Sequence, residues 1–546
     1  MQRHGGQILV DQLKLHGVRR VFSVPGESFL AALDGLYESG VENIVCRQEG
    51  GATMMAEAHG KMTGQPGVCF VTRGPGASNA SAGIHIAKQD STPLVMFVGQ
   101  IARGHRDREA FQEVDYRAFF GPLAKWVTEV DQTERLPEYI NRAFHVAMSG
   151  RPGPVVLALP EDMLSALSDV PELAPSAPAL GNVASGDIDA ILNHLKGAKN
   201  PLIMVGGSSW SVQAARDMQS FAEANHLPVT VTFRRQDMMD NRSPSYIGDS
   251  GVGVNPKLAA RLKGVDRLLV LGARLGDTAT GGYELLDPAN PGVSICHVYP
   301  DPDLPGSVYR TDVAVTARVV DVVRELAKAP VIGDWSDVTM QARAEYEAWR
   351  KPKETPGTVK LEQVMLWLSD NLPHDAIVTN GAGNYAAFLH RYMQFRQYGT
   401  QLAPTSGSMG YGFPAAVAAA VEHRDRTVVC VAGDGCFQMT LNEMSTAAQY
   451  GAKLIVIVCN NGRYGTIRMH QEKHYPTRVS GTDLVNPDFA ALGRAYGGVG
   501  EVVEDGADFA DAFARAQAAP GLAVIELKLD PEMLSTGQTV SEVRGS

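Results

Sequence analysis

Residues 433–461 hold the stretch that decides the fold. It reads Gly433-Asp434-Gly435-Cys436-Phe437-Gln438-Met439, followed by a helix-like segment, the apolar run 454–459 and Asn460-Asn461. A further apolar run, 427–432, comes directly before it. Continuous apolar runs separated by a helix are typical of strands in a parallel sheet that is buried on both faces. The stretch therefore predicts a strand, Gly-Asp-Gly, a helix, a second strand and Asn-Asn.

Two polar residues, Asp434 and Asn461, directly follow these predicted strands. Parallel strands place both at the same carboxyl edge, where such sheets bind ligands. Glycines beside them let the backbone approach a phosphate closely, and Asp and Asn oxygens suit an ion such as Mg²⁺. Gly-Asp-Gly alone is usually a turn, and Asn-Asn alone is usually a loop. Together they predict a clamp for a diphosphate and its metal. No Gly-x-x-x-x-Gly-Lys-Ser/Thr precedes a helix, which disfavours an ordinary nucleoside triphosphatase.

Length and composition are those of a multidomain globular protein. The chain has 546 residues, which predicts two to four domains with ample core. Apolar residues make up 44% of it and charged residues 20%, and its 56 glycines fit many tight strand-to-helix turns. The formal net charge of −11 argues against a nucleic-acid partner.

The cysteines and the apolar runs exclude further classes of protein. Six cysteines stand singly, mostly in apolar runs, and no Cys-x-x-Cys occurs. We interpret them as reduced, buried side chains, so neither a zinc site nor a disulfide framework is expected. No uninterrupted apolar run approaches membrane length, and the first residues have no long apolar core. We expect a cytoplasmic enzyme without a membrane partner.

Three α/β units follow one another along the chain, separated by two linkers. The linkers, at 171–186 and 351–357, are rich in Pro, Gly and small or polar residues. The first and third units repeat one order of features: small residues and glycines, a helix, an apolar strand, and then Gly-Pro-Gly or Gly-Asp-Gly. All doubly wound units share some of this order, but the repeat favours two domains of related fold. Strands are expected at 18–24, 43–46, 67–72, 94–98, 155–159, 201–205, 229–231, 267–271, 293–298, 376–379, 427–432 and 454–459.

On these residues the chain resembles the thiamine diphosphate (ThDP)-dependent enzymes, and most of all the acetolactate synthase branch. The resemblance covers nearly the whole chain. It implies an α/β fold of three doubly wound parallel-sheet domains and a metal held by Asp434, Asn461 and the main-chain carbonyl of Arg463. The implied domains are a pyrimidine-binding domain at 1–170, a central Rossmann-like domain at 187–335, a diphosphate- and Mg²⁺-binding domain at 356–530, and a C-terminal tail at 531–546.

Glu49 is the implied catalytic residue. A glutamate at a strand-to-helix junction is usually an acid favoured by the helix dipole. Here Glu49-Gly50-Gly51-Ala52 resembles the family's catalytic segment, in which the carboxyl group hydrogen-bonds N1′ of the aminopyrimidine. The resemblance thus implies acid–base catalysis relayed through the cofactor.

Further residues are assigned to the cofactor by the same resemblance. Met in a glycine-rich turn is more often a packing residue, but Met409 matches the bulky residue that bends the cofactor and brings its reacting atoms together. The Gly407 carbonyl would accept from the 4′-amino group. The full implied cofactor-binding set is Pro25, Thr72, Asn79, Gln112, Gly383, Asn384, Tyr385, Gly407, Met409, Gly433, Asp434, Gly435, Cys436 and Asn461.

The substrate side is where the chain departs from acetolactate synthases. The Arg that binds the second 2-oxoacid there is replaced by Thr278, and a pocket Trp is replaced by His470. Thr cannot reproduce a bidentate Arg–carboxylate contact. For Phe111 and Gln112 an ordinary helix start is an equal alternative to substrate contact. The implied pocket residues are Gly26, Glu27, Phe111, Thr466, Ile467 and His470.

Two alternatives stay open for the reaction and for the central domain. The first reaction is decarboxylation of a 2-oxoacid followed by ligation to a carbonyl acceptor. The second is a simple decarboxylation that releases an aldehyde, since 461–468 resembles benzoylformate decarboxylase. The central domain either binds FAD, as in true acetolactate synthases, or keeps the fold without it. The family also implies a homodimer or homotetramer with the active site at the dimer interface.

Overall fold

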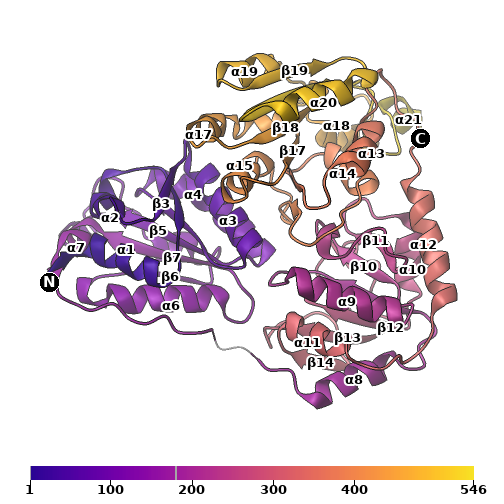
Figure 1. Cartoon of the computed structure of the whole chain (residues 1–546), viewed down its shortest axis with the longest axis horizontal. Coiled ribbons are helices and arrows are strands. Elements are labelled where there is room, and N and C mark those ends of the chain that lie inside the picture. Colours follow the sequence, from indigo (N-terminus) through magenta and orange to yellow (C-terminus); the bar gives the residue numbers. More distant parts are fainter. Residues whose placement is uncertain (1, 179–180, 546) are drawn as a thin grey trace. The chain divides into compact units, whose positions relative to one another are not determined.

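Three parallel sheets of six strands each make up the described fold, and helices connect most of the consecutive strands (Figure 1). The computed structural model describes residues 2–178 and 181–545. All strand pairs within these three sheets are parallel, and most of their residues are buried, so helices must cover both faces. The predicted α/β class of doubly wound parallel sheets is therefore confirmed.

The N-terminal sheet has the order β3-β2-β4-β5-β7-β6. Its strands are β2 (Arg20–Ser23), β3 (Glu42–Val45), β4 (Gly67–Val71), β5 (Leu94–Gln100), β6 (Trp126–Glu129) and β7 (Pro154–Pro160). Its helices are α1 (Gly5–Leu15), α2 (Leu30–Leu36), α3 (Glu49–Thr63), α4 (Pro75–Asp90), α5 (Tyr116–Phe120), α6 (Leu136–Met148) and α7 (Glu161–Ser165). A short antiparallel pair, β1 (Arg3–His4) with β8 (Leu167–Ser168), joins the start of this domain to its end.

The C-terminal sheet has the order β16-β15-β17-β18-β20-β19. Numbered in chain order within each sheet, the N-terminal and C-terminal sheets both read 2-1-3-4-6-5. The expected relation between the first and third units is thus present in their topology. The strands are β15 (Ile377–Asn380), β16 (Gln401–Leu402), β17 (Val428–Gly433), β18 (Leu454–Asn460), β19 (Val499–Val503) and β20 (Leu522–Lys528). The helices are α13 (Leu361–Asn371), α14 (Tyr385–Tyr392), α15 (Gly412–Glu422), α16 (Asp434–Gln438), α17 (Met444–Gln449), α18 (Gly465–His474), α19 (Phe489–Ala495), α20 (Phe509–Ala518) and α21 (Val540–Gly545).

The central sheet has the Rossmann-type order 3-2-1-4-5-6 instead. Its strands are β9 (Pro201–Val205), β10 (Val229–Thr232), β11 (Tyr246–Ser250), β12 (Arg267–Leu271), β13 (Ser294–Tyr299) and β14 (Val313–Thr316). Its helices are α8 (Ser185–Leu195), α9 (Val212–Ala224), α10 (Pro256–Lys263), α11 (Val319–Leu326) and α12 (Ser336–Arg350). The sequence pattern missed β11 and β14 because neither shows a long apolar run.

The segment after Gly-Asp-Gly is not a single helix. It consists of α16, a 3₁₀ turn (Leu441–Glu443) and α17. The break matters because the described chain forms two compact units, and the two helices belong to different ones. The first unit combines the N-terminal sheet with Phe413–Arg424 and Thr440–Lys453, and the second holds the central and C-terminal sheets. Helices α15 and α17 therefore pack with the first unit, although they connect strands of the second.

The predicted first linker carries no helix or strand among its described residues up to α8, and its start is attached to the N-terminal domain. Gln12 Nε2 donates to the Leu173 carbonyl at 2.7 Å, and Leu173 N donates back to Gln12 Oε1 at 3.0 Å. Two predicted linker residues, 179 and 180, lie outside the described part of the chain.

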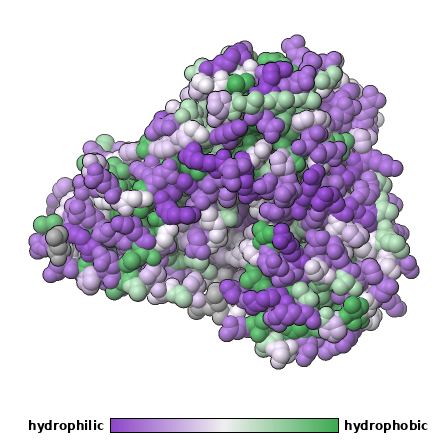
Figure 2. Space-filling view, in the orientation of Figure 1, coloured by the Kyte–Doolittle hydropathy of each residue, from purple (hydrophilic) through white to green (hydrophobic). Residues whose placement is uncertain are grey.

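One face of the molecule is seen in the space-filling view. On the face seen in Figure 2, hydrophilic residues predominate and hydrophobic ones are scattered among them. Within residues 2–178 and 181–545, no helix combines the length and the apolar character that crossing a membrane requires.

Candidate active site

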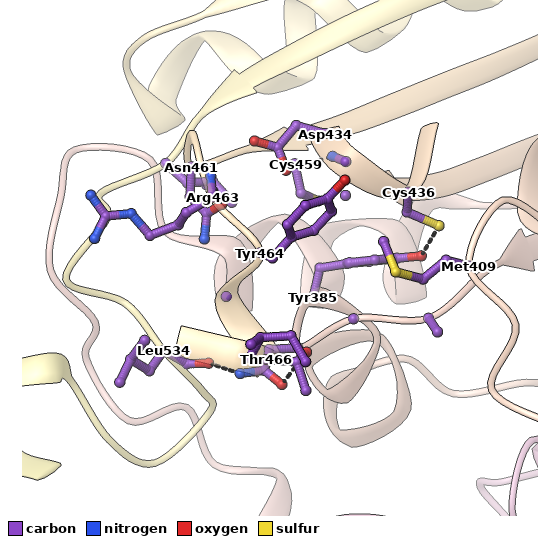
Figure 3. Close-up of a pocket in the computed structure, with 18 of the residues that line it drawn as sticks. Tyr385, Met409, Asp434, Cys436, Cys459, Asn461, Arg463, Tyr464, Thr466 and Leu534 are labelled. Carbon is purple, nitrogen blue, oxygen red and sulfur yellow. Dashed lines mark hydrogen bonds between the residues drawn. The ribbon is translucent and has the colours of Figure 1, made fainter. Parts of the chain in front are cut away.

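A cavity of about 260 Å³ lies at the carboxyl edge of the C-terminal sheet (Figure 3). Strands β15, β17 and β18 end at its wall, and the start of α18 and residues 529–534 complete it. Of the C-terminal residues predicted for cofactor, metal and substrate, all but His470 line this cavity. Those that do are Gly383, Asn384, Tyr385, Gly407, Met409, Gly433, Asp434, Gly435, Cys436, Asn461, Arg463, Thr466 and Ile467.

Asp434 is buried at the first residue of α16, with its carboxylate held by three donors. Its Oδ1 accepts from Gly435 N at 2.8 Å, and its Oδ2 accepts from Gly462 N at 2.9 Å and from Asn486 Nδ2 at 2.7 Å. Burial raises the pKa of this carboxyl group, and the three hydrogen bonds oppose that rise. The amides therefore fix the direction in which the carboxylate faces.

Asn486 is a site residue that the sequence pattern missed. Its Nδ2 donates to Asp434 Oδ2 and also to Asn460 Oδ1, the latter at 2.8 Å. The side-chain oxygen of Asn486 accepts from Gln438 Nε2 at 2.7 Å. Asn486 therefore ties the ends of β17 and β18 together behind the cavity. It lies in an irregular segment before α19, so no periodicity or motif marks it.

The loop that follows Asn-Asn is held in place by a second segment. Tyr464 N donates to the Thr482 carbonyl at 2.8 Å, and Leu484 N donates to the Gly462 carbonyl at 2.8 Å. Asn461 Oδ1 accepts from Arg463 N at 3.3 Å. Asn461 and Arg463 thereby lie on one side of the cavity with Asp434, as Figure 3 shows.

Close approaches explain two of the glycines. A Cβ atom on Gly435 would lie 2.5 Å from the ring of Tyr464, which lines the cavity. Gly383 has φ +148°, and a Cβ atom there would lie 2.8 Å from the ring of Tyr385. Side chains at these positions would fill the cradle that a diphosphate needs.

Met409 and Cys436 form the wall opposite the loop after β18. Cys436 Sγ receives a hydrogen bond from Tyr385 Oη at 3.4 Å and from Gly410 N at 3.2 Å. Met409 is partly buried against the C-terminal core and lines the cavity. It enters on a turn in which Gly407 adopts φ +69°, so the backbone conformation there requires glycine.

Helix α18 and residues 529–534 form the remaining wall of the cavity. Thr466 Oγ1 donates to Asn384 Oδ1 at 2.9 Å, and Asn384 Nδ2 donates to the Leu534 carbonyl. His470 lies further along α18, outside the lining of the cavity, with its ring stacked on that of His474 at 6.2 Å between centroids. Its place in a substrate pocket stays a prediction.

The predicted N-terminal residues gather at the carboxyl edge of their own sheet. Glu49 is nearly buried at the start of α3, where its Oε2 accepts from Asn79 Nδ2 at 3.0 Å. A Cβ atom on Gly76 would lie 3.0 Å from Glu49 Oε1, and one on Gly26 would lie 2.5 Å from the Thr72 side chain. The loop after β2 thus packs against Thr72 at the end of β4, and the start of α4 packs beside the glutamate.

Glu443 holds the backbone just before Glu49, and the sequence pattern missed it. Its carboxylate accepts from Arg47 N at 3.2 Å, Gln48 N at 3.0 Å and Thr446 Oγ1 at 2.6 Å. The side chain is fully buried, and burial raises the pKa of its carboxyl group. Because nearly 400 residues separate the partners along the chain, no local signal reveals this contact.

Phe111 and Gln112 do not start a helix, so that alternative is wrong. They lie in a turn, and α5 begins only at Tyr116. Gln112 adopts φ +65° and packs against Gly74, whose N donates to Tyr116 Oη at 2.9 Å. Phe111 is 72% exposed. Pro25 and Glu27 follow β2, and Glu27 approaches Arg73 at 3.5 Å.

Residues at the carboxyl edge of the central sheet pack closely on one another. A Cβ atom on Gly207 would lie 1.9 Å from the Gly272 carbonyl oxygen, which shows that the ends of β9 and β12 touch. The buried Trp210 donates from Nε1 to the Gly206 carbonyl at 3.0 Å, and buried Phe233 packs against Gly251. Rossmann-type sheets bind dinucleotides at this edge, and both alternatives for the domain, with FAD and without it, stay predictions.

Comparisons with known proteins match each of the three domains. Residues 3–119 match the N-terminal TPP binding domain of thiamine pyrophosphate enzymes, 188–326 the central domain and 381–527 the C-terminal TPP binding domain. The chain is 32% identical over 520 residues to the acetolactate synthase large subunit of Parasynechococcus marenigrum, covering 92% of this chain and 83% of the relative.

A second relative is the acetolactate synthase isozyme 2 large subunit of Escherichia coli. The two chains are 32% identical over 497 residues, which covers 90% of each. The large subunit of Corynebacterium glutamicum is 31% identical over 513 residues, covering 90% of this chain and 81% of the relative. These matches span all three sheets and both predicted halves of the site. The chain therefore belongs to the thiamine pyrophosphate enzymes and is a ThDP-dependent enzyme related to acetolactate synthase large subunits.

Proposed function

We propose that this enzyme uses ThDP and Mg²⁺ to decarboxylate a pyruvate-like 2-oxoacid and to join the remaining fragment to a carbonyl acceptor. The observation that carries the proposal is the cavity at the ends of β15, β17 and β18. Oxygen ligands and a glycine cradle meet there on one side, and α18 forms a wall for substrate on the other. The relatives named above are acetolactate synthases, which supports a reaction of this class.

The donor set fits Mg²⁺ and a diphosphate. We assign the metal to Asp434, Asn461 and the main-chain carbonyl of Arg463, which offer one carboxylate, one amide oxygen and one carbonyl oxygen. Mg²⁺ prefers such ligands and completes its octahedron with phosphate oxygens and water. The buried Asp434 carboxylate lacks a cation among the described protein groups that its hydrogen bonds reach, so a bound cation would offset its burial.

When bound, ThDP supplies a carbon nucleophile and an electron sink for the decarboxylation. Met409 would support the bent shape of the cofactor, and the Gly407 carbonyl would accept from its 4′-amino group. Glu49 would hold a proton at its carboxyl oxygen toward N1′, and Asn79 orients that carboxyl group. Thr466 and Ile467 would contact the 2-oxoacid.

The acceptor side favours a second candidate reaction as well, in which a proton takes the place of the carbonyl acceptor. Thr278 stands where the acceptor-binding Arg of acetolactate synthases is expected. Its Oγ1 donates to Oδ1 of the neighbouring Asp277. Product analysis with a panel of 2-oxoacids decides between them. A 2-hydroxy ketone product supports ligation. If every acid yields only an aldehyde, the ligation proposal is wrong and simple decarboxylation takes its place.

For the central domain we propose the alternative without flavin. The buried Trp210 packs at the carboxyl end of β9, where a Rossmann-type sheet binds a dinucleotide, and this supports the proposal. An absorbance spectrum of the purified enzyme tests this. We expect no flavin bands and no change in activity on adding FAD, and a stoichiometric flavin spectrum would contradict the proposal.

A further inference from the structure

The last described segment, residues 531–545, is tied to the cavity wall at its beginning. Met533 and Leu534 line the cavity, and the Leu534 carbonyl accepts from Asn384 Nδ2. Asn384 Oδ1 in turn accepts from Thr466 Oγ1, the second residue of α18, at 2.9 Å. Figure 3 shows Leu534 and Thr466 together on the side of the cavity away from Asp434.

The same segment is tied to α18 a second time, through Glu472. The Arg544 guanidinium of α21 donates from Nε to Glu472 Oε2 at 2.9 Å and from Nη2 to Oε1 at 2.8 Å. Arg468 Nε donates to Oε1 at 2.7 Å, and Thr477 N donates to Oε2 at 3.1 Å. Each oxygen of the Glu472 carboxylate thus accepts two hydrogen bonds. Two of the four come from the planar Arg544 guanidinium, whose paired geometry fixes how the two side chains face each other.

Burial makes this contact consequential. The Glu472 side chain is 0% exposed, and the hydrogen bond from Arg544 is the main reason that its pKa falls to about 2. Without Arg544, this buried carboxylate would keep Arg468 and the Thr477 amide but would lose both bonds that hold α21 to it, which favours local opening of α21. Apolar packing acts at the same place, where Met469 of α18 contacts Leu534, Val540 and Val543.

We propose that Glu472 is a positioning residue for the reaction: it clamps α21 to α18 and thereby keeps Met533 and Leu534 in place as the wall that shields the substrate from water. The catalytic consequence rests on the proposed function, whereas the clamp itself rests only on the contacts above. A wall that excludes water protects a reactive fragment from protonation before an acceptor arrives. Weakening the clamp should therefore change substrate affinity and the fate of the fragment, with the cofactor side of the cavity left intact.

Two single variants, one on each side of the contact, test the clamp independently. Glu472→Gln keeps the size of the side chain but removes its charge. Arg544→Gln changes a residue that is 41% exposed, so it spares the fold even if the buried change does not. Glu501→Gln serves as a matched control, because Glu501 makes a similar two-bond contact with Arg515 at 3.0 and 2.8 Å on the surface.

Hydrogen exchange measured by mass spectrometry reports on the clamp independently of activity. We expect amides of residues 531–545 to exchange about tenfold faster in both variants, which corresponds to about 1.4 kcal/mol of local opening free energy. The rest of the protein and the Glu501→Gln control should exchange as wild type does. Unchanged exchange of 531–545 in both variants would overturn the clamp.

Steady-state kinetics with product analysis reports on the positioning role. We expect KM for the 2-oxoacid to rise about tenfold and the share of free aldehyde among the products to increase, while ThDP affinity from fluorescence titration stays unchanged. Faster exchange with wild-type KM and products would reduce Glu472 to a structural residue and overturn the proposal. If wild-type enzyme converts no 2-oxoacid at all, the proposed function fails, and the exchange experiment still decides the clamp.

Discussion

Two polar side chains outside every motif, the half-buried Asn486 and the fully buried Glu443, set the local geometry of the site. Asn486 orients Asp434 and Asn460 from behind, and Glu443 holds the backbone amides that lead into Glu49. Both contacts join segments distant in the sequence, so only folding brings them together. The motif residues, by contrast, follow strands directly and could be placed from the pattern of apolar runs.

Changing Glu49 to Gln tests the proposed proton relay. The amide keeps the size of the side chain and can still accept from Asn79, but it carries no acidic proton. We expect kcat to fall by about 10²–10⁴-fold, the usual contribution of a general acid–base group. ThDP affinity, measured by fluorescence titration, should change little. Turnover near the wild-type level would refute the assignment.

Changing Asn486 to Ala tests the support behind the metal ligands. Asp434 would lose one of its three donors and Asn460 would lose its link to it. Outer residues that orient metal ligands typically contribute about 10–100-fold to metal affinity. We therefore expect the Mg²⁺ concentration for half-maximal activity to rise by a factor in this range.

Asn371→Ala is the matched control for this experiment. Asn371 donates to the Trp367 carbonyl at the end of α13, on the surface. Its removal should leave the Mg²⁺ requirement unchanged. An equal Mg²⁺ requirement in Asn486→Ala and wild type would show that Asp434 keeps its orientation without Asn486.

At the scale of elements, strand ends rather than helices place the chemistry. The predicted residues of the C-terminal domain gather because β15, β17 and β18 are parallel neighbours whose carboxyl ends share one edge. Helices α15 and α17 were harder to foresee, since they connect these strands but pack with the N-terminal sheet. Their place follows from side-chain contacts such as the ion pair of Arg20 with Glu422, the last residue of α15.

The packing of α15 should depend on acid pH. The hydrogen bond with His59, together with the charges of Arg20 and Arg19, lowers the pKa of Glu422 to about 2. A carboxyl group with a lowered folded-state pKa stabilises the fold above its unfolded pKa, and that stability is lost as pH falls toward 2.

The variant Glu422→Gln measures this contribution. We expect it to lower the free energy of unfolding at pH 7 by about 1–2 kcal/mol, less than the full pKa shift implies because water partly screens the group. The difference from wild type should vanish as pH falls from about 4.5 toward 2 in denaturant titrations. A pH-independent difference would rule out the ionic explanation. Glu138→Gln, which breaks an exposed pair with Arg135, should have little effect at any pH.

At the scale of the whole molecule, the two predicted halves of the site stand on sheets of one topology, each in its own compact unit. Glu49 belongs to the first unit and Asp434 to the second. The family resemblance predicts that the glutamate of one copy serves the cofactor held by another, in a homodimer or homotetramer.

Mixing two inactive variants tests that arrangement. Glu49→Gln and Asp434→Ala each remove one half of the site. If sites form between copies, co-expression creates mixed dimers that contain one intact site, so part of the activity returns. Size-exclusion chromatography with light scattering should give the mass of a dimer or tetramer. An active monomer, or no recovery on co-expression despite mixed dimers, would contradict a shared site.

The sequence by itself determined the fold class and the residues that follow the strands, because apolar runs and the turns between them are local signals that parallel sheets convert into one edge. Its resemblance to known enzymes gave the cofactor family. Tertiary structure alone revealed the contacts of Asn486, Glu443 and the segment 531–545, since each contact joins segments that are distant in the sequence. It also revealed the close packing at the carboxyl edge of the central sheet. Close packing of Trp210 and the touching strand ends depends on exact side-chain and backbone positions, which no pattern of residue types records.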